Sequence, residues 1–298
     1  MPIEPGKKER ENLWKLLEMA RTEDLGSGDV SSEILPDAVH AHAQFVARQP
    51  MVVCGAALLE AIAVSYDGQI VTRMDVREGQ SVAKGAVLAT WTGPAKGILA
   101  AERVGLNFFQ RLSGVATTTA QYVKATVGTR ANIYDTRKTT PGWRDLEKYA
   151  VRAGGGRNHR KGLYDAVLIK DNHLAILAKA EGQNPITAAA RELERLRPYL
   201  GEKAFIELEV DTLEQYAVAL TLPVDIILLD NMECDQLRQA VAMRRAAGFE
   251  HTLELEASGG ITLANVAEVA ATGVERISIG ALTHSAASVD IALDINLD

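Results

Sequence analysis

The second half of the chain alternates short apolar runs with longer amphipathic runs. The short runs predict strands at 131–135, 165–170, 204–210, 224–229, 252–257 and 275–279. The amphipathic runs predict helices near 143–153, 173–197 (broken at 182–185), 212–221, 233–247 and 262–272. Because strands that alternate with helices build a parallel sheet through right-handed crossovers, we predict an α/β domain here.

The ends of the predicted strands favour a barrel over a doubly wound sheet. Each strand places a polar group at or near its carboxyl end, namely Asp135, Lys170, Glu209, Asp230, Ser258 and Ser278. In a barrel these ends converge on one mouth, whereas a doubly wound sheet gathers such residues at one switch point. Because six units fall short of eight, we expect an incomplete, irregular α/β barrel.

Two of the predicted strands alternate apolar residues with glutamates. Glu207 and Glu209 share one face of the first strand, and Glu254 and Glu256 share one face of the second. An ionised carboxylate inside a barrel costs several kcal/mol, so these groups need a cation or a metal. The lysines that we expect to provide the charge are Lys138 and Lys170.

The first half of the chain has a different pattern. It predicts helices at 9–21 and 55–65, strands near 41–53, 69–76 and 86–92, and a helical region at 98–127 interrupted near 113–114. The glycine-punctuated stretch 76–94 resembles the hammerhead fold of biotinyl and lipoyl carrier domains. We expect an N-terminal α/β sandwich domain over 1–128, the barrel over 129–285, and a C-terminal segment 286–298 that packs back on the first domain.

Composition excludes several classes of protein. The 298 residues carry a formal charge of -7, which argues against a general nucleic-acid binder. No apolar run approaches the roughly 20 residues of a membrane helix, and nothing at the N-terminus suggests export. Cys54 and Cys234 lie far apart without metal-type spacing, so we expect free thiols in a reducing cytoplasm.

A basic island interrupts this acidic chain. Between Arg137 and Lys170 there are nine lysines and arginines but only three acidic residues. A local cationic cleft in an acidic protein suits a small anionic ligand. A solvated basic face is the alternative on charge alone.

Glycine-rich turns supply further candidate chemistry. The turns Ser258–Gly260 and Ser278–Gly280 follow the last two predicted strands and precede helices, where backbone N–H groups commonly bind phosphate. Gly154-Gly155-Gly156 lacks the dinucleotide-binding spacing, and we interpret it as a loop that delivers His159 and Arg160 to the site.

Several of these stretches together resemble one family. They are EDLGSGDVSS, ERVGLNFFQRLSGVAT, DTRKTTPGWR, RAGGGRNHRKGLYDAVLIKDNH, ELEVDTL, LLDNM, EASGGI and ISIGALTHS. They resemble quinolinate phosphoribosyltransferases, also called carboxylating nicotinate-nucleotide pyrophosphorylases. The resemblance implies an N-terminal α/β sandwich plus an incomplete barrel, assembled as a homodimer or larger. It also implies synthesis of nicotinate mononucleotide, pyrophosphate and CO₂ from quinolinate and phosphoribosyl pyrophosphate with Mg²⁺, a step of NAD biosynthesis.

The resemblance also implies roles for individual residues. Those expected around the quinolinate carboxylates are Arg137, His159, Arg160 and Lys170, with Arg103 donated by the neighbouring subunit. Lys138 would lie close to both substrates, and Glu209 and Asp230 would hold the ribose and Mg²⁺, directly or through water. The groups expected to bind the 5′-phosphate are Ser258, Gly259, Gly260, Ser278, Ile279 and Gly280.

Two alternatives remain open at this point. One is a paralogous phosphoribosyltransferase of the same fold that acts on another carboxylated heterocycle such as nicotinate. The other is a non-catalytic carrier or binding module. A carrier needs an acceptor lysine at an exposed turn, usually beside Asp or Met, whereas Lys84 lies between Ala83 and Gly85.

Overall fold

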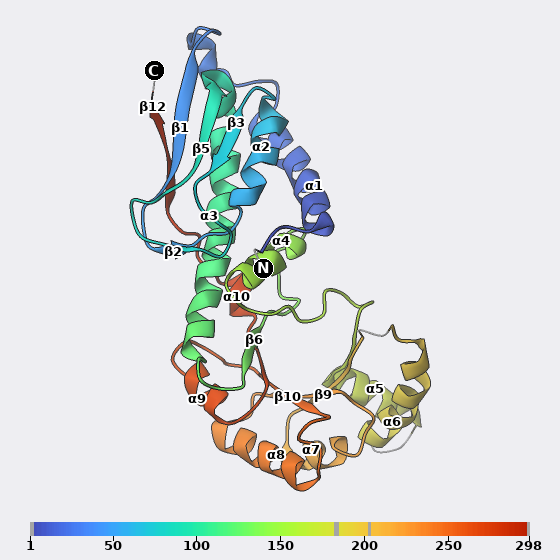
Figure 1. Ribbon diagram of the computed structural model, residues 1–298. Helices are drawn as coiled ribbons and strands as arrows, with labels where there is room; N and C mark the ends of the chain where they lie inside the picture. Colours follow the sequence, from blue (N-terminus) through green and yellow to red (C-terminus); the bar gives the residue numbers. More distant parts are fainter. Residues whose placement is uncertain (1–2, 182–184, 202–203, 297–298) are drawn as a thin grey trace. The chain divides into compact units, whose positions relative to one another are not determined.

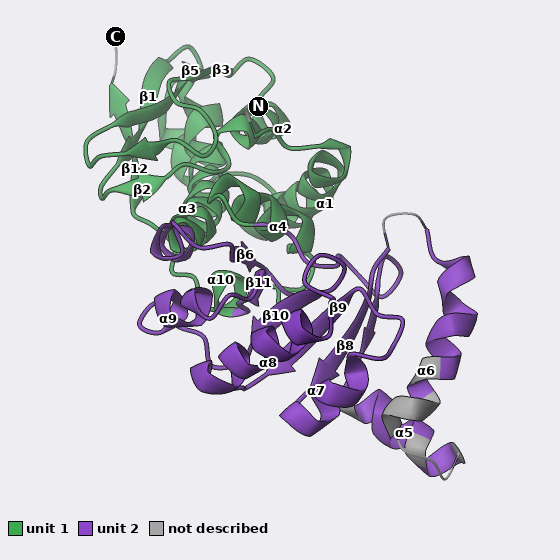
Figure 2. Ribbon diagram, turned by 60° about the horizontal axis from the view of Figure 1, so that its bottom comes forward, with its two compact units in different colours: residues 1–120, 138–156, 281–298 green, residues 121–137, 157–280 purple. Residues whose placement is uncertain are grey.

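The computed structural model describes residues 3–181, 185–201 and 204–296. The chain divides into two compact units (Figure 2). Unit 1 comprises residues 1–120, 138–156 and 281–298, and unit 2 comprises residues 121–137 and 157–280. No helix within the described residues is long and apolar enough to cross a membrane.

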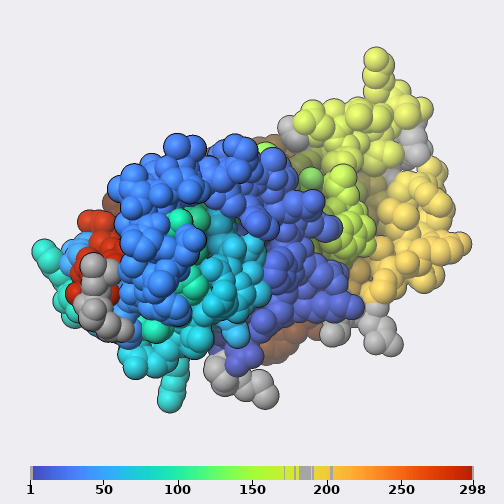
Figure 3. Space-filling view, turned by 90° about the horizontal axis from the view of Figure 1, so that it is seen from above, coloured from blue at the N-terminus to red at the C-terminus, as the bar shows by residue number. Residues whose placement is uncertain are grey.

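Unit 1 contains an antiparallel four-stranded sheet with the order β12-β1-β5-β3. Its strands are β1 (His40–Ala47), β3 (Val71–Met74), β5 (Val87–Pro94) and β12 (Ile291–Asn296), and a separate pair joins β2 (Met51–Val52) to β4 (Ser81–Val82). The C-terminal strand β12 lies beside β1, as Figures 1 and 3 both show. Phe45 packs edge-on against Trp91 with ring centroids 4.7 Å apart, and both side chains are fully buried.

The helices of unit 1 are α1 (Lys7–Asp24), α2 (Leu59–Tyr66), α4 (Arg144–Ala153) and α10 (Ala281–His284), with 3-10 turns η1 (Ser31–Ile34) and η2 (Ala56–Leu58). Helix α3 (Ala95–Ala125) is continuous over 31 residues, so the predicted interruption near 113–114 is wrong. A β-carbon on Gly114 would lie 2.1 Å from the Ala287 carbonyl oxygen. This glycine therefore permits a close backbone approach and does not end the helix.

Unit 2 contains six parallel strands. They are β6 (Asn132–Tyr134), β7 (Val167–Ile169), β8 (Ile206–Val210), β9 (Ile226–Asp230), β10 (Glu254–Ser258) and β11 (Arg276–Ser278). Their order is β6-β11-β10-β9-β8-β7, in which the last strand pairs with the first. This is the circular order of a barrel with an opening between β6 and β7, which confirms the predicted incomplete barrel.

Helices follow the strands of unit 2 as predicted. They are α5 (Asp171–Glu181), α6 (Pro185–Leu196), α7 (Leu213–Ala219), α8 (Cys234–Ala246) and α9 (Val266–Ala271), with the 3-10 turn η3 (Arg197–Tyr199). Helices α7 and α8 cover one face of the sheet in Figure 2. The predicted break at 182–185 falls mostly on residues 182–184, which lie outside the described residues.

Candidate active site

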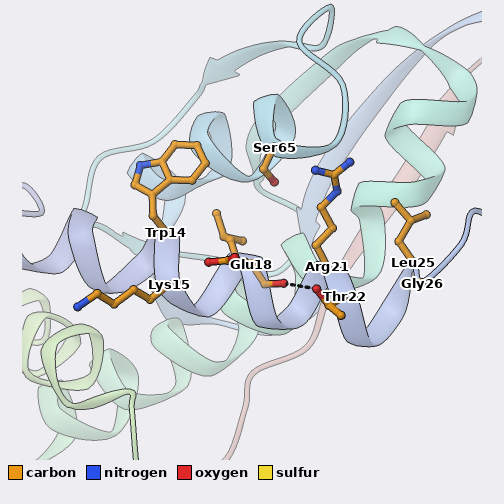
Figure 4. A pocket seen from close by; sticks show the side chains of 9 residues that line it. Trp14, Lys15, Glu18, Arg21, Thr22, Leu25, Gly26 and Ser65 are labelled. Carbon is orange, nitrogen blue, oxygen red and sulfur yellow. Dashed lines mark hydrogen bonds between the residues drawn. The ribbon is translucent and has the colours of Figure 1, made fainter.

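A hollow of about 620 Å³ lies on unit 1 beside α1 (Figure 4). Residues of α1, the turn after it and Ser65 of α2 line it. The Thr22 hydroxyl already donates to the Glu18 carbonyl at 2.8 Å. None of the nine lining residues is a predicted site residue. Most of the predicted site residues belong instead to unit 2, and the two in unit 1, Arg103 and Lys138, do not line this hollow.

The segment after the triple glycine extends the parallel sheet of unit 2. The Arg157 N–H donates to the Ile133 carbonyl at 2.8 Å, and the Asp135 N–H donates to the Arg157 carbonyl at 3.1 Å. The fully buried carboxylate of Asp135 then accepts from Asn158 Nδ2 at 2.6 Å and from the His159 N–H at 2.8 Å. These bonds place His159 beside the end of β6.

His159 lies between two buried glutamates. Its Nε2 is 2.9 Å from Glu207 Oε2 and 3.4 Å from Glu256 Oε1, and both carboxylates are 0% exposed. Burial, followed by the charge of Glu256, raises the pKa of Glu207. Burial opposes a charge on His159 as well, but the two carboxylates outweigh it and raise the pKa of the imidazole to about 9.

Arg276 supplies the cation that these carboxylates need. Its Nε donates to Glu256 Oε2 at 2.6 Å, and its guanidinium stacks 3.8 Å from the ring centroid of Tyr134. The partners of Glu207 and Glu256 are thus His159 and Arg276, and the predicted assignment to Lys138 and Lys170 is wrong for both glutamates. The strand register pairs Glu256 with Arg276, a relationship that the spacing of residues along the chain does not reveal.

Arg137 and Arg160 are neighbours despite their like charge. Arg160 is 9% exposed, and its Nη1 donates to the Ala166 carbonyl at 3.4 Å. Burial, followed by the charge of Arg137, lowers the pKa of the Arg160 guanidinium. Two cations held together in this way favour an anionic ligand, because the ligand relieves their repulsion and its carboxylates match guanidinium geometry.

Two carboxylates lie at the carboxyl ends of adjacent strands. Glu209 on β8 pairs with the ammonium group of Lys170, as predicted for this lysine. Asp230 ends β9, and its Oδ2 accepts from Asn231 Nδ2 at 2.6 Å. Asn231 adopts a left-handed conformation with φ of 52°, and its N–H donates to the Ser258 carbonyl at 2.9 Å.

These carboxylates suit Mg²⁺ through their donor atoms. Mg²⁺ is usually held by one or two carboxylates together with substrate phosphates, which matches two oxygen donors such as Glu209 and Asp230. Within the described ranges, one group of three residues brings possible metal-ligand atoms within 4.8 Å of one another. This group consists of His159, Glu207 and Glu256. Arg276 already supplies a positive charge to that group.

The two glycine turns follow neighbouring strands, β10 and β11. Helix α9 begins at Val266 and not near Thr262, so the backbone N–H groups of the first turn itself would have to bind phosphate. A β-carbon on Gly259 would lie 2.2 Å from Asn231 Oδ1, whereas one on Gly260 would meet nothing within 4 Å. Gly259 is therefore required for the close packing of the turn against the residue after Asp230.

Arg103 and Lys138 belong to unit 1, and both are exposed. The Lys138 carbonyl accepts from Thr283 Oγ1 at 2.7 Å. Arg111 donates to the Thr283 carbonyl and to Glu147, whose carboxylate also accepts from the Thr140 N–H at 3.0 Å. The sequence did not predict these hydrogen bonds around Lys138, because they join residues up to 172 positions apart.

Comparisons with known proteins fit this geometry. The N-terminal domain of quinolinate phosphoribosyl transferase matches residues 29–113, and the C-terminal domain of the same enzyme matches residues 115–294. The chain belongs to the quinolinate phosphoribosyltransferase family. The hammerhead-like stretch with Lys84 is thus part of this family's N-terminal domain and not a separate carrier module.

Relatives resemble the chain over nearly its whole length. A probable carboxylating nicotinate-nucleotide pyrophosphorylase of Bacillus subtilis is 40% identical over 96% of this chain and 94% of its own. The Mycobacterium leprae enzyme with that name is 41% identical over 92% and 93%. Among solved structures, NadC of Streptococcus pyogenes has a TM-score of 0.86 at 33% identity, covering 97% of this chain and 98% of its own.

Proposed function

We propose that this chain transfers the phosphoribosyl group of phosphoribosyl pyrophosphate to quinolinate and releases pyrophosphate and CO₂, giving nicotinate mononucleotide. The observation that carries the proposal is the pair of neighbouring guanidinium groups, Arg137 and Arg160, in the unit that also presents Glu209 and Asp230 at its strand ends. The two guanidinium groups suit a diacid, and the two carboxylates suit a ribose that becomes positively charged.

Binding of the pyridine diacid rests on cations of unit 2. Arg137 and Arg160 are forked donors for carboxylates, and Lys170 adds a third positive charge. Nicotinate has a single carboxylate, which would leave part of this cationic set without an anion. The geometry therefore favours quinolinate over nicotinate as the substrate.

Transfer to the ring nitrogen requires mainly orientation and electrostatic stabilisation. Departure of pyrophosphate leaves an oxocarbenium-like ribose, which the carboxylates of Glu209 and Asp230 would stabilise. These two residues would also hold Mg²⁺, which neutralises charge on the leaving group when it is bound. After N-ribosylation the ring nitrogen is cationic and stabilises the carbanion that forms at C2 when the 2-carboxylate leaves as CO₂. A proton from water then adds to C2 and completes nicotinate mononucleotide. No protein nucleophile is needed.

We further propose that the active form is a homodimer or larger. Arg103 is exposed on α3 of unit 1, as is Asn107 four residues later on the same helix face. Arg103 would complete the quinolinate site of the neighbouring copy.

A substrate comparison tests the proposed function. The purified protein is incubated with phosphoribosyl pyrophosphate, Mg²⁺ and either quinolinate or nicotinate, and nicotinate mononucleotide is measured by mass spectrometry. We expect product from quinolinate. Product from nicotinate alone would show that the chain is a paralogue with a different substrate.

A further inference from the structure

The carboxylate of Glu147, on helix α4, is enclosed inside unit 1. It is 0% exposed, and its Oε1 accepts from Arg111 Nη2 at 2.7 Å. Two further hydrogen bonds come from Thr140, whose backbone N–H donates to Oε2 at 3.0 Å and whose hydroxyl donates to Oε1 at 2.9 Å. A buried carboxylate is tolerated only when it is paired, so these bonds are strongly favoured. They fix the main chain two residues after Lys138.

Lys138 itself is held from α10. Thr283 is 0% exposed, and its hydroxyl donates to the Lys138 carbonyl at 2.7 Å. The Thr283 carbonyl accepts in turn from Nη2 of Arg111, the same nitrogen that donates to Glu147. Nη1 of Arg111 donates to the Ala286 carbonyl. One guanidinium therefore connects both supports of the segment that carries Lys138.

We propose that Arg111 is a positioning residue, which fixes the main chain of Lys138 so that its ammonium group meets phosphoribosyl pyrophosphate in a single orientation. Arg111 acts through its two hydrogen-bonded partners, Glu147 and Thr283, and contacts neither substrate. This inference rests on the proposed function and on the expected place of Lys138 close to both substrates.

The role of Arg111 depends on the shape of its head group. A guanidinium presents several N–H donors in one fixed plane, so it can serve a carboxylate and two carbonyl oxygens at once. The side chain is 22% exposed, so most of it is already withdrawn from water. A lysine at this position would keep the charge beside Glu147 but would not hold all three acceptors in a fixed geometry.

A fixed main chain matters for Lys138 because its side chain is long and exposed. Such a side chain loses rotamer freedom when its ammonium group binds a phosphate. Holding the main chain at Lys138 and again at Thr140 removes part of the remaining freedom before the anion arrives, which favours binding through preorganisation. Loosening either support should therefore lower the affinity for phosphoribosyl pyrophosphate.

Calorimetry with phosphoribosyl pyrophosphate and Mg²⁺ tests the inference without depending on turnover. Thr283→Val removes the hydroxyl that donates to Lys138 and keeps the shape of the side chain. We expect the dissociation constant to rise about tenfold, as for one lost hydrogen bond, and to rise much less in Thr283→Ser, which keeps the hydroxyl. Thr119→Val is the matched control, because Thr119 is equally buried and its hydroxyl donates to the Val115 carbonyl within α3. This variant should bind as tightly as the unsubstituted protein.

A double-mutant cycle separates positioning from a purely structural role. The ammonium group is absent from Lys138→Ala, so adding Thr283→Val to that variant should have little further effect on the affinity. An equal loss of affinity with and without the Lys138 side chain would overturn the inference. Unchanged affinity in Thr283→Val alone would overturn it as well.

Arg111→Lys tests the arginine itself. We expect it to lower the affinity for phosphoribosyl pyrophosphate at least as much as Thr283→Val does, and we expect this loss to disappear in the Lys138→Ala protein. Urea unfolding shows whether each variant is folded before its affinity is compared. If Arg111→Lys does not fold, Thr140→Val breaks the other support at an exposed position and is read in the same cycle.

Failure of this inference and failure of the proposed function give different results. If the unsubstituted protein binds phosphoribosyl pyrophosphate but forms no nicotinate mononucleotide from quinolinate, the proposed function is wrong, and the cycle still reports on Lys138. If it forms the product but the cycle shows no coupling between Thr283 and Lys138, the positioning role is wrong and the proposed function stands. If it does not bind phosphoribosyl pyrophosphate, both are wrong.

Discussion

Arg276 and Glu256 form a buried ion pair across the neighbouring strands β11 and β10, with the arginine Nε 2.6 Å from the glutamate Oε2. Their side chains are 8% and 0% exposed. The guanidinium also stacks on Tyr134 and lies 5.5 Å from the ring centroid of Phe205. This one cation is thus both the counter-charge of the carboxylate cluster and part of the aromatic packing around it.

Removing this cation should destabilise the protein strongly. Arg276→Met keeps much of the side-chain volume but removes the guanidinium partner of the buried Glu256, and breaking such a buried pair typically costs about 3–5 kcal/mol. The free energy of unfolding, measured by urea titration, provides the test. Arg238→Met is the matched control, because Arg238 pairs with Asp235 on the surface, and it should change stability little. Similar losses in the two variants would contradict the role of Arg276.

The same ion pair predicts acid sensitivity. Burial raises the pKa of Glu256, but His159 and Arg276 outweigh it and lower the pKa to about 2. A carboxylate whose pKa falls on folding adds stability above its unfolded pKa, about 4.5, and loses it as the pH falls towards 2. The unfolding free energy should therefore fall over this range, and in Glu256→Gln it should fall less steeply. An unchanged slope in that variant would show that other groups cause the acid sensitivity.

Gly259 should be intolerant of a methyl group. Gly259→Ala would push a β-carbon to 2.2 Å from Asn231 Oδ1 and displace the amide that holds Asp230. We expect the KM for phosphoribosyl pyrophosphate to rise on the order of tenfold, as for one lost hydrogen bond. Gly260→Ala is the control, because φ is positive at both glycines but the space at Gly260 is open. A comparable rise of this KM in Gly260→Ala would show that backbone strain alone causes the effect.

Arg137→Ala should separate the two substrates. Without this guanidinium, quinolinate affinity measured by calorimetry should fall at least about tenfold, as for a lost charge-assisted hydrogen bond. Affinity for phosphoribosyl pyrophosphate should be largely retained. Arg157→Ala removes an exposed cation nearby in the sequence and should leave both affinities close to those of the unsubstituted protein. If Arg137→Ala binds quinolinate as tightly as the unsubstituted protein, Arg137 does not bind this substrate.

Mixed oligomers test the proposed donation of Arg103 by a neighbouring copy. Arg103→Ala and Lys170→Ala should each be inactive, and a mixture should recover part of the activity, because some mixed dimers keep one complete site. Subunit exchange is verified first with differently tagged chains. If exchanged dimers recover no activity, Arg103 does not act across the interface.

The sequence predicted the order and type of the barrel elements because helix and strand periodicity are local properties. It also predicted that Glu207 and Glu256 point inward. It did not predict Arg276 as their partner, because that pairing depends on the register of β10 against β11. The continuity of α3 at Gly114 was missed for a similar reason, since the glycine is needed by Ala287, which is distant in sequence.

The proposed reaction couples phosphoribosyl transfer to loss of the 2-carboxylate of quinolinate. Quinolinate labelled with ¹⁴C in that carboxylate is incubated with the protein, and released CO₂ is counted beside nicotinate mononucleotide. We expect equal amounts of both products, formed only when phosphoribosyl pyrophosphate and Mg²⁺ are both present. No labelled CO₂ with all components present, or its release without phosphoribosyl pyrophosphate, would refute the proposed reaction.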